Sequence, residues 1–168
     1  MSKWDKGVDY ETIYTRLLRK IDTVKDNTKC YLIICLIQLR NGSRISEAIR
    51  GFKEWVKNNK TELYIPVSKK KKIETRLMVI PSEVLNYRLY CVDLLDINDK
   101  VLRERVRATL YYYFKINTHS LRYAFITYLL RSNVNPAIVS KLLKHSKLDT
   151  LLHYVQVKES EKVLKNLS

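Results

Sequence analysis

Hydrophobic positions near the start of the chain repeat at helical spacing. Three apolar residues spaced four apart, starting at Ile13, fall on one side of a helix that we expect at residues 10–20. Residues 28–39 are apolar on every side, which is typical of a helix at the centre of a core. Asn-Gly-Ser at positions 41–43 predicts its end, because glycine readily adopts the left-handed conformation that closes a helix.

A third helix and then a group of strands should follow. Ser43 is expected to cap this helix, with Glu47 in its first turn and an end near Gly51. Beyond it the composition shifts to Val, Ile, Tyr and Leu, which favours strands, and a run of lysines stands in the turn between two of them. Strands are expected at residues 52–56, 62–67 and 75–80.

The rest of the chain has a helical pattern. Thr118 is expected to cap a helix over residues 119–132, and Asn135 followed by Pro136 predicts the start of another that ends near Lys144. Further helices are expected at residues 99–113, 148–155 and 159–167. The fold class that follows is mainly α with a small antiparallel β-sheet (α+β), within one domain.

The charge of the chain points to a polyanionic partner. The 168 residues are 46% hydrophobic, enough for a folded core, and carry 32 Lys and Arg against 17 Asp and Glu, a formal net charge of +15. Nucleic acid and an anionic membrane are the two candidates. The longest apolar run, residues 30–37, is far shorter than the roughly 20 residues of a membrane-spanning helix. The N-terminus also lacks the apolar segment of a signal peptide, so we expect a cytoplasmic protein.

The three cysteines carry no motif. Cys30, Cys35 and Cys91 form no Cys-x-x-Cys pair, and the first two stand in an apolar stretch. We therefore expect small core residues and neither a disulfide nor a zinc site.

Three short polar segments hold the candidate chemistry, and a tyrosine follows the last of them. Taken singly, each has an ordinary interpretation. Arg44 at a helix start is either solvated or faces an anionic ligand, because the helix dipole disfavours a cation there. His119 and Arg122 share a helix face and could be a buried or a surface pair, while His145 could be a core histidine. Tyr154 is one of 12 tyrosines. The segments are S-R-I-S-E at 43–47, T-H-S-L-R-Y at 118–123 and L-L-K-H-S at 142–146.

Taken together and in this order, the segments resemble the phage integrase family of tyrosine recombinases. The resemblance covers residues 28–154 and includes the two-stranded hairpin after the first arginine. It implies that Arg44 and Arg122 clamp the scissile phosphate of DNA. It also implies that His119 assists proton transfer and phosphate binding, that His145 hydrogen-bonds a phosphate oxygen, and that Tyr154 is the nucleophile.

The resemblance further implies a lysine in the hairpin turn as the general acid for the leaving 5′-oxygen. Lys72 fits the family spacing best, with Lys71 and Lys70 next. The other lysines of the turn, including Lys69, then contact DNA phosphates. Glu47 matches an acidic residue that we interpret as structural support.

Two positions depart from the family pattern. Lys144 stands where the family usually has glycine, so either the chain bends differently there or this lysine adds a contact to the DNA backbone. Tyr123 stands where the family often has histidine. Neither departure removes a group with a catalytic role.

The resemblance implies an enzyme that cuts and rejoins double-stranded DNA through a 3′-phosphotyrosine, without metal, ATP or other cofactor. It also implies self-association on DNA as a synaptic tetramer, with residues 159–168 packed on a neighbouring protomer or folded back on their own. Two alternatives stay open: a type IB topoisomerase and a non-catalytic basic DNA-binding module. Residues 1–168 match a catalytic domain without the family's N-terminal helical domain, so we expect part of a longer protein or a stand-alone catalytic domain.

Overall fold

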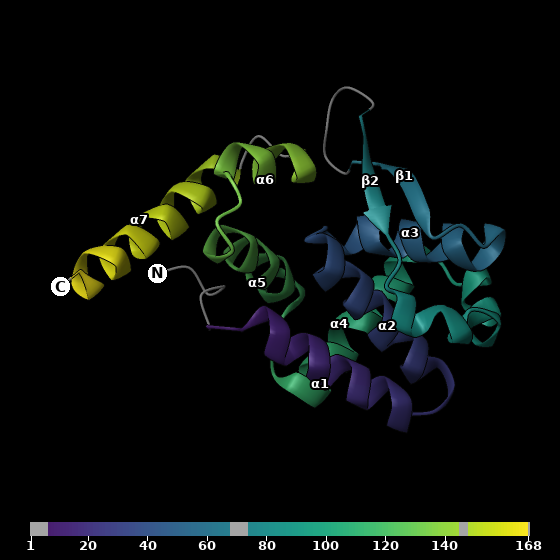
Figure 1. Cartoon of the computed structure of the whole chain (residues 1–168). Coiled ribbons are helices and arrows are strands. Elements are labelled where there is room, and N and C mark those ends of the chain that lie inside the picture. Colours follow the sequence, from purple (N-terminus) through teal and green to yellow (C-terminus); the bar gives the residue numbers. More distant parts are fainter. Residues whose placement is uncertain (1–6, 68–73, 145–147, 168) are drawn as a thin grey trace.

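The computed structural model describes the backbone of residues 7–67, 74–144 and 148–167, with their side chains except those of residues 148–155 and 158. In this part of the chain, most elements are helices, and one two-stranded antiparallel sheet lies at the edge of the helical body (Figure 1), which confirms the predicted fold class. Among the described helices, none combines the length and apolar composition needed to span a membrane.

Helix α2 (Asp26–Asn41) forms the centre of the core, as its apolar pattern predicts. Every side chain from Cys30 to Leu39 is buried, and α2 contacts several other helices. One of these is α1 (Tyr10–Thr23), which buries the three apolar residues that the sequence places on one face. Gly42 follows α2 in the left-handed conformation, with φ of 59°, so the predicted end of the helix is confirmed.

Helix α3 (Ile45–Asn58) is longer than predicted. The prediction of a strand at residues 52–56 is wrong. Phe52, Trp55 and Val56 recur at helical spacing and bury one face of α3 in the core. Ser43 is not the cap of this helix either. It is fully buried in the preceding loop, and Arg44 occupies the N-cap position.

The two remaining strands form the predicted hairpin. Strand β1 (Glu62–Pro66) pairs antiparallel with β2 (Thr75–Val79), and Leu63 lies opposite Met78 on the buried face. Arg76 lies opposite Ile65 on the same face and is only 3% exposed. A cation therefore occupies a strand position that normally holds an apolar residue.

Two 3-10 helices, η1 (Ser82–Tyr87) and η2 (Leu89–Asp96), follow the hairpin and precede α4 (Asp99–Phe114). Cys91 of η2 forms a buried disulfide with Cys30 of α2, with 5.8 Å between the Cα atoms. The expectation of no disulfide is thus wrong. The partners are 61 residues apart, and only packing of η2 on α2 brings them together.

The last three helices form a smaller layer. Helix α5 (Thr118–Arg131) is capped by Asn117, whose side chain accepts from the Ser120 amide, and not by Thr118 as expected. Helix α6 (Pro136–Leu143) starts after Asn135 as predicted. The last element is one helix, α7 (Leu148–Asn166), where two were expected, and it extends away from the main body (Figure 1).

Removing the disulfide should destabilise the fold. In the chain-entropy description, closing a loop of this length stabilises the folded state by about 4 kcal/mol, so Cys91→Ala should lower the free energy of unfolding by up to that amount. Urea denaturation of the variant and of wild type measures the difference.

Counting thiols provides the control. A thiol reagent should detect one free thiol, that of Cys35, in unfolded protein without reductant, and three free thiols after reduction. Three thiols without reductant, together with unchanged stability of Cys91→Ala, would contradict the cross-link.

Candidate active site

The loop between α2 and α3 lies directly on α5. A Cβ atom on Gly42 would lie 2.1 Å from Cδ1 of the Phe125 ring, so only glycine fits at this contact. Gln38 fixes the loop from below, because its Nε2 donates to the Ser43 carbonyl (3.1 Å) and to the Thr118 carbonyl of α5 (3.2 Å). The start of α3 is therefore held against the first turn of α5.

This packing brings the two predicted arginines into one cluster. Arg122 of α5 is 6% exposed, and its Nη1 atom is buried without a hydrogen-bond partner in the described part of the chain. Burial lowers the pKa of Arg122 to about 10, with the Glu47 carboxylate opposing the shift. Arg44 lies close enough to lower the pKa of Arg122 further. Both guanidiniums still carry their charge at neutral pH.

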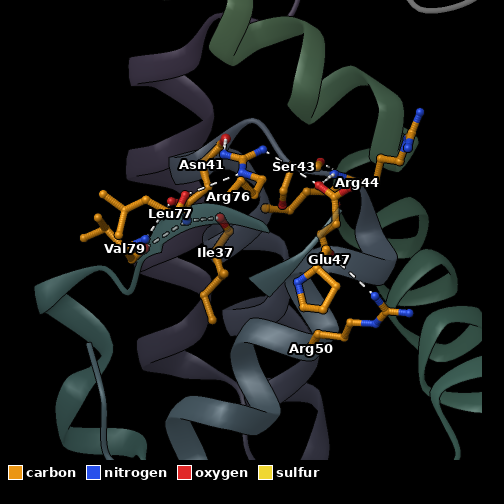
Figure 2. Close-up of polar contacts among 11 residues, drawn as sticks. Ile37, Asn41, Ser43, Arg44, Glu47, Arg50, Arg76, Leu77 and Val79 are labelled. Atoms are coloured by element: carbon orange, nitrogen blue, oxygen red, sulfur yellow. Dashed lines mark hydrogen bonds and ion pairs between the residues drawn. The ribbon is translucent and has the colours of Figure 1, made fainter. Parts of the chain in front are cut away.

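Glu47 is the buried carboxylate of this cluster. It is 1% exposed, and its Oε1 accepts from the Arg44 amide (3.2 Å) at the start of α3. The same oxygen lies 3.8 Å from Nη1 of Arg76. Figure 2 shows the carboxylate turned toward the backbone of Ser43 and Arg44, while the Arg44 side chain extends away from it. Glu47 thus supports the loop that presents Arg44.

Arg76 is a third arginine, which the sequence interpretation missed. Its Nη2 donates to the Asn41 carbonyl at the end of α2. Burial lowers its pKa, and Glu47 partly offsets this effect. The signal that could have revealed it is the strand alternation, since position 76 falls on the same face as the buried Met78.

Asn41 ties the hairpin to the end of α2. Its Oδ1 accepts from the Val79 amide (2.8 Å), and its Nδ2 donates to the Val79 carbonyl (2.9 Å) and the Ile37 carbonyl (2.8 Å). The side chain thus pairs with β2 as a strand neighbour would (Figure 2). Asn41 and Arg76 together fix β2 beside the loop that holds Arg44.

The structure describes the other predicted residues only in part. His119 is exposed in the first turn of α5, one turn before Arg122. Lys69, Lys70, Lys71, Lys72 and His145 lie outside the described residues.

Tyr154 lies within α7, and only the backbone of this residue is described. Helix α7 contacts α5 and α6. Arg131 of α5 and Glu159 of α7 form an ion pair (3.0 Å), five residues beyond Tyr154. The helix that holds the predicted nucleophile is therefore attached to the helix that holds Arg122.

Comparison with known proteins decides the family. The chain is 37% identical to the protein named "Putative integrase ORF241" of Acidianus two-tailed virus, over 98% of the chain and 69% of that protein. It is 30% identical to "Putative integrase V10" of Sputnik virophage, over 95% and 88% respectively. The chain belongs to the integrase family of tyrosine recombinases.

A short segment of the chain also matches a third protein. A stretch of 48 residues, 29% of the chain, is 44% identical to "Tyrosine recombinase" of Pseudothermotoga lettingae and covers 17% of it. No family model and no solved structure matches the chain. DNA is the partner that membership of this family implies.

Lys144 adopts the conformation that glycine prefers. It follows α6 as the C-cap with φ of 48° and ψ of 46°, in the left-handed region. This conformation costs an L-residue about 1–2 kcal/mol, which gives a physical reason for the glycine that the family usually has here. The side chain is exposed and remains available for a contact with DNA.

Replacing Lys144 by glycine should relieve this strain. We expect Lys144→Gly to raise the free energy of unfolding by up to about 1 kcal/mol, because the relief exceeds the loss from a more flexible unfolded chain. Lys141→Gly is the matched control, since it removes the same charge from inside α6 and should lower stability by about 0.5–1 kcal/mol. Urea denaturation compares the two, and equal destabilisation would rule out strain at position 144.

Proposed function

We propose that this chain is the catalytic domain of a site-specific DNA recombinase that cleaves and rejoins DNA through a 3′-phosphotyrosine. The observation that carries the proposal is the juxtaposition of Arg44 and Arg122, with a buried Arg122 donor that has no hydrogen-bond partner in the described residues. A phosphodiester oxygen would satisfy that donor. The positive end of α3, whose N-cap is Arg44, would favour the same anion.

The proposed reaction is a transesterification at phosphorus. The Tyr154 hydroxyl oxygen attacks the phosphorus, the P–O5′ bond breaks, and a Tyr154–phosphate ester replaces it. Arg44 and Arg122 bind the nonbridging oxygens and stabilise the charge that develops in the transition state. Because the ester is retained, the free 5′-hydroxyl of another strand can reverse the reaction without ATP.

Protons must move at both ends of the reaction. The tyrosine hydroxyl has an ordinary pKa of about 10 and has to lose its proton during attack. We assign assistance in this transfer to His119, and a hydrogen bond to the phosphate to His145. Lys72 protonates the departing 5′-oxygen, which is a poor leaving group as an alkoxide.

Contacts outside the catalytic cluster would hold the DNA and the neighbouring protomers. Lys69, Lys70, Lys71 and Lys144 are assigned to the phosphate backbone, where they position the duplex without reading its sequence. Three exposed apolar side chains lie at the end of α7 and just after it, namely Val163 (62%), Leu164 (71%) and Leu167 (70%). Their exposure favours packing on a neighbouring protomer of a synaptic tetramer over folding back on the same chain.

Tyr154→Phe should abolish covalent attachment to DNA while leaving DNA binding intact. The assay uses a library of duplexes of randomised sequence, in which the position of a single nick varies from one duplex to the next. Cleavage just upstream of the nick releases a short strand with a 5′-hydroxyl, so the reaction cannot reverse and the ester is trapped. Covalent complexes are recovered after denaturation in SDS, and their DNA is sequenced, which also identifies the target site. Wild type should form adducts and the variant none.

Absence of a Tyr154-dependent adduct in this library, with normal DNA binding, would leave only the non-catalytic DNA-binding module. Adducts accompanied by relaxation of supercoiled DNA, without strand exchange between sites, would favour the type IB topoisomerase. Strand exchange between two recovered sites is the result that we expect.

Arg122→Ala should slow adduct formation at saturating DNA by about 100- to 1,000-fold, because it removes donors that act mainly in the transition state. Arg122→Lys should restore little, since an ammonium lacks the planar fork of a guanidinium. DNA affinity should change little, because many other phosphate contacts remain. Arg107→Lys, on an exposed face of α4, is the matched control and should keep the wild-type rate. Equal rates for Arg122→Lys and wild type would remove Arg122 from the phosphate clamp.

A further inference from the structure

Three arginines in the candidate active site share one carboxylate. Glu47 is the acidic group that acts on the pKa of Arg44, Arg76 and Arg122, in each case opposing the effect of burial. Formally, three cations and one anion leave the cluster with a charge of +2 (3 − 1 = 2). The distribution of this excess depends on which arginine Glu47 pairs with.

The geometry pairs Glu47 with Arg76. Both side chains are almost fully buried, at 1% and 3% exposed, and Nη1 of Arg76 lies 3.8 Å from Oε1 of Glu47. This contact is an ion pair and not a hydrogen bond, because Nη1 of Arg76, like Nη1 of Arg122, has no hydrogen-bond partner in the described residues. Glu47 thus pairs electrostatically with Arg76 on the side of the hairpin, and the buried Nη1 donor of Arg122 is left for a ligand.

Arg76 is held in this place by its side chain and by its backbone. Its Nη2 donates to the Asn41 carbonyl, and its backbone belongs to β2, which Asn41 binds through both polar groups of Val79. The carbonyl of Asn41 also lies at the negative end of α2, which favours a cation. Figure 2 shows the Arg76 guanidinium beside Asn41. The pairing partner of Glu47 is therefore fixed before any ligand binds.

We propose that Arg76 is a positioning residue that keeps the Glu47 carboxylate engaged, so that Arg122 and Arg44 present their guanidiniums to the phosphate. The inference rests on the proposed function, since it concerns how the phosphate clamp is kept open. A buried carboxylate must be paired, and a bidentate arginine–carboxylate pair uses two guanidinium donors. Without Arg76, Glu47 takes its partner from Arg122 or Arg44, which then binds phosphate less well.

The decisive comparison is between one substitution and two. Arg76→Met removes the cation with an apolar side chain of comparable length, and the cluster falls to +1 (2 − 1 = 1). Adding Glu47→Gln removes the carboxylate that would otherwise take Arg122, and the charge returns to +2. The amide oxygen of the introduced glutamine can still accept from the Arg44 backbone. If Arg76 only held the fold together, the second substitution would add damage.

The rate of adduct formation is measured at saturating DNA, with the duplex that the wild type selects. Arg76→Met should lower the rate at least about 10-fold with little change in DNA affinity, and Arg76→Met/Glu47→Gln should recover most of the loss. Arg76→Lys keeps a cation beside Glu47 and should stay within a few-fold of wild type. Urea denaturation of each variant confirms that the protein is folded under the assay conditions.

The inference is overturned if the double variant is as slow as Arg76→Met or slower, or if Arg76→Met reacts at the wild-type rate. Either result, obtained while the wild type forms its Tyr154-dependent adduct, leaves the proposed function standing. A wild type that forms no adduct overturns the proposed function first, and the inference with it.

Discussion

Burial of a single carboxylate organises the polar part of this protein. An ionised side chain that is shielded from water is destabilising unless charges and donors surround it. Glu47 meets this requirement with the Arg44 amide and the Arg76 guanidinium. Three arginines surround this one carboxylate, so their positive charge exceeds its negative charge. The arrangement that stabilises the buried carboxylate therefore leaves positive charge at the start of α3. A phosphate group is the natural counter-ion for that excess.

The apolar frame sets the position of this cluster. Helix α2 is buried from Lys29 to Leu39, and its end is fixed by Gly42 against the Phe125 ring and by Asn41 against β2. The disulfide from Cys30 to Cys91 holds the opposite part of the helix to η2. Arg44, Arg76 and Arg122 therefore come from three elements that meet on one rigid helix. Helix α7 has fewer such attachments, and the Arg131–Glu159 ion pair joins it to α5 at a partly exposed site.

The sequence predicted the elements whose pattern is clear. The helix around Ile13 followed from spacing, the helix around Leu32 from its continuous apolar run, and the hairpin at Leu63 and Met78 from a composition typical of strands. The prediction failed at residues 52–56, where aromatic and branched side chains favoured a strand although the buried residues recur at helical spacing. The disulfide depended on tertiary contacts between distant residues.

The polar cluster was only partly within reach of the sequence. Arg44 and Arg122 were predicted because they stand in ordered motifs, and the structure brings them together. Arg76 stands in no motif, and its role depends on Asn41, which lies 35 residues earlier. The local sequence pattern indicates the role of Arg76 only by placing a cation at an inward-facing strand position.

We propose that Tyr154 attacks a phosphate held by Arg44 and Arg122, and mass spectrometry of the trapped adduct identifies the residue that has reacted. Trypsin should release residues 148–158, in which Tyr154 is the only tyrosine. After nuclease digestion, we expect this peptide to bear a nucleotide joined through its 3′-phosphate to Tyr154. A nucleotide on any other residue, or one joined through a 5′-phosphate, would rule out Tyr154 as the nucleophile that forms a 3′-phosphotyrosine.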